Sequence, residues 1–272
     1  GASGRSGGQV NPGLKLNPDD LVAKFGDDLG HRMAKRWGNG GPLLFDLIKK
    51  HGIQCDLAPV GFLRTATSQK TLTGLQTIAR QWRTHGADYD EVSRRDVSQM
   101  VGADAYIGGV IDRRGGNIHP LNYALGLAEA AEKAGAIIHG HSRATGYSTA
   151  SGKVTVQTKG GEVTAQRALV CTNAYTDDFG GKLGKTVVPV TSVQVATAPL
   201  SNNIARSILP DGHSPTDKRR LIFYFRKTAD GRFVMGGRGA MGGGSARQRQ
   251  PALREAAVDL YPPLGDAAWD SA

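Results

Sequence analysis

The first segment able to do chemistry is a run of small residues at the start of the chain, GASGRSGGQ over residues 1–9. Backbone N–H groups in a glycine-rich loop approach a flat or charged ligand closely, and they form concave sites for phosphate. Arg5, the one charged residue of the run, would add a charge-assisted hydrogen bond. A plain flexible terminus has a similar composition, so from this run alone the two interpretations are equally good.

A second candidate follows the apolar stretch 168–171. We expect residues 167–172 to form a buried strand that ends at Asn173. In open parallel sheets, ligands bind beyond the carboxyl ends of the strands. The small and polar residues Thr172, Asn173 and Ala174 would therefore suit contact with a nucleotide, but taken alone an ordinary loop explains them better.

A third candidate is the stretch LIFYFR at residues 221–226. If it is a strand, alternation places Phe223 and Phe225 on one face and Tyr224 and Arg226 on the other. A tyrosine beside an arginine would grip a substrate carboxylate. A solvent-facing strand surface is at least as good an explanation.

Other chemistries have weaker support. His139 and His141 would share a strand face, but no Cys, Asp or Glu stands beside them at a ligand-like spacing, so we expect no metal site. The sequence has no Walker A motif, and no complete G-x-G-x-x-G opens a helix directly after a strand. No residue is assigned a catalytic role.

Composition narrows the class of protein. The 272 residues, 39% hydrophobic and 21% charged, are typical of a globular chain, and no apolar run reaches the ~20 residues of a membrane span. The net charge of +10 comes from scattered Lys and Arg, which disfavours a nucleic-acid partner. Cys55 and Cys171 form no C-x-x-C pair, so we expect two inert core thiols and a cytoplasmic setting.

Helical and strand patterns are interleaved along the chain. A four-residue apolar spacing predicts one helix from residue 17 through 33, and Pro120 to Gly135 predicts a helix followed by a buried strand at 136–140. This order is typical of a parallel sheet. Alternation and turns predict antiparallel strands at 153–158, 163–166, 186–200, 221–226 and 232–236. The last two would form a hairpin with its turn at residues 229–231. We therefore expect two domains built from interleaved segments.

Five segments occur in the order found in one known family: residues 1–10, 116–136, 169–175, 189–200 and 224–238. Together they resemble the FAD-dependent amine and amino-acid oxidoreductases of the D-amino-acid oxidase superfamily. The γ-glutamylputrescine oxidase and the glycine and sarcosine oxidase branch is the most similar. Two departures are Ser6, where that branch often has Asn, and Ala144, where the family usually has Val.

The resemblance implies an α/β fold with an antiparallel sheet, in which an incomplete Rossmann-like FAD-binding domain is interleaved with a substrate domain. The FAD-binding segments would be 1–54, 119–185 and the returning 251–272, and the substrate segments would be 55–118 and 186–250. The family's first strand, its glycine turn and its ribose-binding Glu would precede Gly1. The segment that closes the flavin site would follow Ala272, so we expect both ends of the enzyme to be missing.

The resemblance also implies a function. FAD would accept a hydride from the carbon beside the nitrogen of a small amine or amino acid, the imine would hydrolyse, and oxygen would reoxidise the flavin. A dehydrogenase that passes electrons to a quinone or a protein stays open, as does a non-catalytic remnant. Tyr224 and Arg226 would bind substrate. The residues implied to contact FAD are Ser3, Gly4, Arg5, Ser6, Gly7, Gly8, Gln9, Ala144 (through its backbone), Thr172, Asn173 and Ala174.

Overall fold

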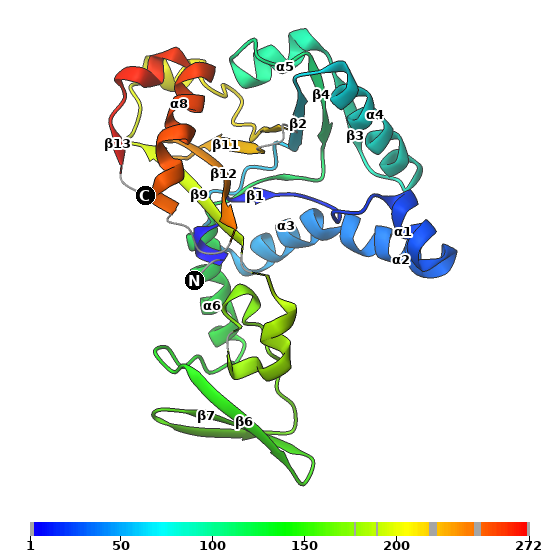
Figure 1. Cartoon of the computed structure of the whole chain (residues 1–272), viewed down its shortest axis with the longest axis vertical. Coiled ribbons are helices and arrows are strands. Elements are labelled where there is room, and N and C mark those ends of the chain that lie inside the picture. Colours follow the sequence, from blue (N-terminus) through cyan, green and yellow to red (C-terminus); the bar gives the residue numbers. More distant parts are fainter. Residues whose placement is uncertain (1–2, 177, 189, 218–221, 242–245, 271–272) are drawn as a thin grey trace.

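The computed structural model describes residues 3–176, 178–188, 190–217, 222–241 and 246–270. A large twisted sheet occupies one half of the molecule in Figure 1, and a narrow three-stranded arm extends away from it. The large sheet has eight strands in the order β13-β9-β12-β11-β10-β2-β4-β3. Their bounds are β2 (Phe62–Ala66), β3 (Tyr89–Val92), β4 (Gly108–Asp112), β9 (Val190–Thr197), β10 (Thr216–Asp217), β11 (Phe223–Lys227), β12 (Phe233–Met241) and β13 (Trp269–Asp270).

The hairpin of β11 and β12 shows why this sheet forms. Gly231 has φ +80°, a left-handed conformation that favours glycine in a tight turn. Alternation along β11 places Phe225 in the core, where it contacts Phe233 and Tyr261 with ring centroids 5.9 and 6.1 Å away. Tyr224 and Arg226 lie on the opposite face, so the predicted hairpin and alternation are confirmed. The strand begins at Phe223, two residues later than predicted, and Leu221 lies outside the described residues.

Helices cover the sheet and connect its strands. α8 (Gln250–Leu260) packs against β9 and β12, and α4 (Gln69–Thr84) packs against β2, β3 and β4. The segment predicted as one helix from residue 17 forms two helices, α1 (Pro18–Phe25) and α2 (Asp27–Gly38). The chain turns between them at Gly26, which has φ +80°. The remaining helices are α3 (Gly40–His51), α5 (Arg94–Val101), α6 (Pro120–Lys133) and α7 (Asn202–Ser207), with short 3₁₀ turns η1 (Ser3–Arg5), η2 (Asn173–Tyr175), η3 (Asp178–Thr186), η4 (Ala246–Arg249) and η5 (Pro262–Asp266).

The arm follows α6 in the chain. It is an antiparallel sheet of β6 (Ala144–Ala150), β7 (Lys153–Thr158) and β8 (Gly161–Ala165), as alternation predicted for the last two strands. A separate two-stranded sheet pairs β1 (Gln9–Val10) with β5 (Gly116–Asn117).

Two predicted strands are absent. Residues 136–140 and 167–172 form no strand, and Ile137 and Leu169 are 82% and 87% exposed instead of buried. A buried parallel strand needs neighbours that pair its backbone and cover its side chains. In the described part of the chain the one parallel pairing joins β10 to β2, and no strand lies beside either segment.

The two cysteines differ in exposure. Cys55 is buried as predicted, but Cys171 is exposed, because the segment that carries it is not packed into a sheet. Among the described residues, no helix is long and apolar enough to cross a membrane.

Candidate functional site

The predicted loop at residues 3–9 lies against the face of the large sheet that carries Tyr224 and Arg226. Arg226 donates its Nε–H to the carbonyl oxygen of Gly7 at 2.7 Å, and Gln194 of β9 donates Nε2–H to the carbonyl oxygen of Arg5 at 2.8 Å. The carbonyl oxygen of Gly8 accepts the N–H of Ile118 at 2.8 Å. The structure therefore brings two groups of predicted site residues together, and three hydrogen bonds hold the loop against the sheet.

Two glycines make this close approach possible. A Cβ on Gly7 would lie 2.9 Å from Cε2 of Tyr224. Gly8 has φ +76°, and a Cβ there would lie 2.3 Å from the carbonyl oxygen of Ile118. Both positions thus exclude side chains, so the glycines of this loop have a packing role in addition to any ligand they approach.

Arg226 is buried, although the sequence left a solvent-facing surface open. Its side chain is 8% exposed overall, and burial lowers the pKa of the guanidinium, an effect that Asp56 and Asp230 oppose. The group remains cationic at neutral pH. Its Nη1 and Nη2 form no hydrogen bond with the described residues, so after holding Gly7 the arginine still has donors for a ligand.

The Tyr224 ring lies over Gly236 of the neighbouring strand and against Gly7 of the loop. Tyr224 pairs with Thr216 of β10 and with Gly236 of β12, and a Cβ on Gly236 would lie 2.2 Å from the tyrosine ring. Burial raises the pKa of Tyr224, and a hydrogen bond with the Ser192 side chain partly offsets that effect. The phenol is therefore neutral at pH 7 and able to donate a hydrogen bond.

The other predicted residues connect to this loop to different degrees. Gln9 donates to the carbonyl oxygens of Ser214 and Pro215 at 3.2 and 3.4 Å. Arg5 donates to the Tyr175 hydroxyl at 2.7 Å, which links the loop to the segment of Thr172 and Asn173. Ser3 and Ser6 are exposed, and Gly4 lies beside Leu121 of α6. Ala174 belongs to the short turn η2.

Ala144 is not brought to the loop. It begins β6 and pairs with Thr158 inside the arm, which Figure 1 shows extending away from the large sheet.

Sequence reasoning missed three residues of this face: Ser192, Gln194 and Gly236. The register places Gln194, Gly236 and Tyr224 side by side on β9, β12 and β11. The sequence carried a signal, because Ser192 and Gln194 alternate with the buried Val193 and Val195. Alternation assigned them a common face, but only the strand order places that face beside Tyr224.

A cavity of about 860 Å³ lies elsewhere, between α2 and the end of α4. None of the predicted site residues lines it or two smaller cavities. Size alone would favour the large cavity. The convergence of the glycine loop, a buried arginine and a half-buried tyrosine favours the Tyr224 face as the candidate site.

Comparison with known proteins adds independent findings. A sequence model described as "DAO: FAD dependent oxidoreductase" matches residues 1–272. Gamma-glutamylputrescine oxidoreductase of Escherichia coli is 33% identical over 239 residues, which are 87% of this chain and 56% of that protein. The probable oxidoreductase OrdL of Haemophilus influenzae is 32% identical over 243 residues, with the same two coverages. The chain thus spans about 56% of the length of these curated relatives.

Solved structures share the fold. Glycine oxidase from Geobacillus kaustophilus superposes with a TM-score of 0.71 at 18% identity, covering 100% of this chain and 71% of its own. L-proline dehydrogenase from P. horikoshii superposes with a TM-score of 0.74 at 15% identity, covering 96% and 68%. The predicted fold class, a mixed α/β protein with an antiparallel sheet, is confirmed.

Proposed function

The chain belongs to the DAO family of FAD-dependent oxidoreductases, and on that premise we propose that the enzyme oxidises the C–N bond of an amine or amino acid. The observation that carries this proposal is the contact of the glycine loop with the half-buried Tyr224 and the buried Arg226. The relative from Escherichia coli is named for a γ-glutamyl amine, and the solved neighbours are named for glycine and proline. All three names refer to amines or amino acids, which is the proposed substrate class.

We propose that FAD binds along the loop at residues 3–9 and at Thr172, Asn173 and Ala174, with the Ala144 backbone as a further contact. The donor set suits an anionic dinucleotide, because it combines a glycine-rich turn with the cationic Arg5. Bound FAD would supply one chemical capacity, acceptance of a hydride from the carbon beside the substrate nitrogen.

The protein's own residues would bind and orient. Tyr224, whose raised pKa keeps the phenol neutral, would donate to a substrate carboxylate or carbonyl oxygen. Arg226 would attract the same anionic group while its Nε keeps Gly7 in place. No protein base is assigned, since loss of hydride needs only a neutral amine.

We propose that the chain is divided into an FAD-binding part and a substrate part, each built from separate segments. Segments 1–54, 119–185 and 251–272 would belong to the FAD-binding part, and segments 55–118 and 186–250 to the substrate part. β11 lies within the second substrate segment, so the Tyr224 face would be the boundary between the two parts.

A second candidate is a dehydrogenase that passes electrons to a quinone or a protein. This second candidate is supported by a solved structure with the same fold that is named L-proline dehydrogenase. The test is to incubate the chain with FAD and a γ-glutamyl amine, glycine, sarcosine or proline, and to follow flavin bleaching without oxygen and peroxide release with oxygen. Bleaching with peroxide supports an oxidase, and bleaching without peroxide supports a dehydrogenase. A flavin bound but unbleached by every amine would contradict the proposed substrate class.

A further inference from the structure

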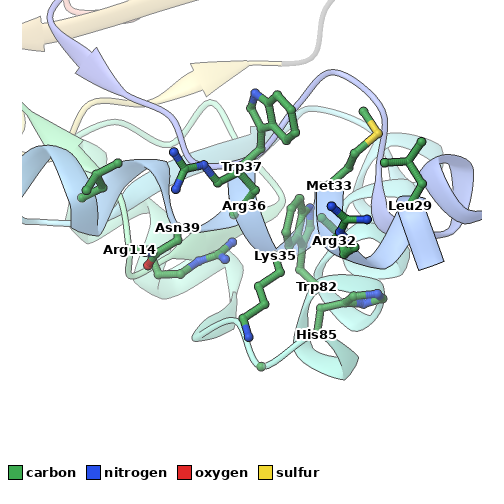
Figure 2. A pocket seen from close by; sticks show the side chains of 14 residues that line it. Leu29, Arg32, Met33, Lys35, Arg36, Trp37, Asn39, Trp82, His85 and Arg114 are labelled. Atoms are coloured by element: carbon green, nitrogen blue, oxygen red, sulfur yellow. The ribbon is translucent and has the colours of Figure 1, made fainter. Parts of the chain in front are cut away.

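A second ligand site is suggested by the cavity between α2 and the end of α4. Figure 2 shows side chains from both helices around it, together with Arg114 from the turn after β4. Its volume of about 860 Å³ lies within the usual range of small-molecule sites, roughly 300–1,000 Å³. It shares no residue with the loop or the Tyr224 face.

The wall of this cavity is positively charged. Arg32, Lys35, Arg36 and Arg114 line it, and none of the described lining residues is an Asp or a Glu. Arg32 pairs with Asp28 at 3.2 Å, but both side chains are mostly exposed, so this pair neutralises little. Lys35 and Arg36 are exposed and form no ion pair with described residues. The excess charge favours an anion.

Arg114 is a prepared donor within this wall. Its Nε and Nη2 bind the fully buried carboxylate of Asp112 at 2.9 and 2.7 Å, and its guanidinium lies over the Trp82 ring, 4.8 Å from the centroid. These contacts fix its orientation. The remaining Nη1 forms no hydrogen bond with described residues and points toward Gly38, 2.8 Å from where a Cβ would lie. A ligand would find this donor already oriented.

The rest of the lining is apolar. Trp82 is buried at the base of the cavity, and Trp37 from α2 is 44% exposed. Leu29, Met33 and Leu43 extend this surface. Exposed tryptophan beside leucine and methionine favours a flat apolar ligand, because its contact with them removes that surface from water.

We propose that this cavity binds a small aromatic anion, with its carboxylate or sulfonate near Lys35 and Nη1 of Arg114 and its ring against the apolar lining. Neither the flavin chemistry nor the amine substrate uses this site. If this cavity binds no such anion, the proposed function is therefore unchanged.

The test uses the full chain with Trp269→Phe, so that Trp37 and Trp82 are the only tryptophans left. The probe is 8-anilino-1-naphthalenesulfonate, followed by quenching of tryptophan emission. N-phenyl-1-naphthylamine, which has the same rings without the sulfonate, reports the contribution of the charge. Lys35→Glu reverses one exposed charge in the wall, and Lys159→Glu makes the same change in the exposed turn between β7 and β8.

We expect saturable quenching by the sulfonate and binding at least about tenfold weaker for the uncharged probe, the change produced by one charge-assisted hydrogen bond. Lys35→Glu should weaken the sulfonate about tenfold, with unchanged circular dichroism, and Lys159→Glu should not. Equal binding by Lys35→Glu and the parent, equal binding of both probes, or sulfonate binding without tryptophan quenching would each overturn the proposal. The last result would place the probe on another apolar surface, such as that of Leu169.

Discussion

Arg226 donates its Nε–H to the carbonyl oxygen of Gly7 across 219 positions of sequence, at 2.7 Å. This bond attaches the glycine loop to the central strand of the β10–β11–β12 group, and it places Gly7 against the ring of Tyr224. One buried side chain thus joins the proposed flavin contacts to the proposed substrate contacts.

Replacing Arg226 tests that connection. Arg226→Ala leaves the Gly7 carbonyl without its charged donor, which should cost about 1.5–3 kcal/mol of unfolding free energy. Urea denaturation measures the loss, and hydrogen exchange at Gly7 and Gly8 should become faster in the folded state. Arg238→Ala, an exposed arginine on the neighbouring strand, is the matched control and should change neither quantity. Unchanged exchange in Arg226→Ala would show that the loop is held by other contacts.

Gly236→Ala should displace the tyrosine ring. A Cβ at this position would lie 2.2–2.6 Å from three atoms of Tyr224, whose ring also contacts Gly7. We expect a loss of roughly 1–3 kcal/mol from overpacking, measured by urea denaturation. Gly265→Ala, where the nearest atom is 3.8 Å away, should lose much less. Equal stability of both variants would mean that the ring has room to move.

Tyr224→Phe removes a hydroxyl and leaves the packed ring in place. In an active, flavin-loaded enzyme this change should raise the KM for the amine substrate by about tenfold, the value of one hydrogen bond to a charged group. Steady-state kinetics measures this change, with whichever candidate amine bleaches the flavin in the test of the proposed function. Kinetics identical to the parent would remove Tyr224 from the substrate site.

Acid should destabilise the protein through His213. This residue is buried, and desolvation lowers its pKa, which Asp211 opposes. The unfolded chain binds the proton more tightly than the folded chain, so stability is full above the ordinary histidine pKa of about 6.5 and falls as pH drops below it. The slope contributed by this one proton cannot exceed about 1.4 kcal/mol per pH unit, and it vanishes once the pH is below the folded pKa.

Urea denaturation from pH 7 to 5 measures that slope. His213→Gln should flatten it, and His139→Gln, at an exposed position, should leave it unchanged. An identical slope in His213→Gln would assign the pH dependence to other groups.

The two thiols should react at very different rates. Cys171 is exposed, whereas Cys55 is buried and burial, with Asp56, raises the pKa of its thiol. A thiol reagent should therefore modify one cysteine in the folded protein and two in urea. Cys171→Ser should abolish the fast reaction. Rapid modification of both in the folded protein would contradict the packing around Cys55.

The local parts of this architecture followed from the sequence. The turn at Gly231 and the alternation of Phe225 with Tyr224 are local properties, and both were predicted. The break at Gly26 was missed because a four-residue apolar spacing continues across it, although Phe25 and Leu29 are exposed.

The features that were not predicted depend on contacts between residues far apart in the sequence. Ile137 and Leu169 lie in apolar runs typical of buried strands, but a run becomes a strand only where neighbouring strands pair with it. Gln194 and Ser192 were missed for the related reason that their place beside Tyr224 depends on the order of β9, β12 and β11. The buried state of Arg226 depends on a partner 219 residues away.

The central claim is that the loop at residues 3–9 binds FAD, and a titration of FAD against the chain tests it most directly. Flavin fluorescence should be quenched saturably. Arg5→Glu should raise the Kd about tenfold, because it replaces a cation beside the anionic cofactor, and Arg167→Glu, at an exposed position on another segment, should leave it unchanged. Equal FAD affinity of Arg5→Glu and the parent chain would contradict the assignment.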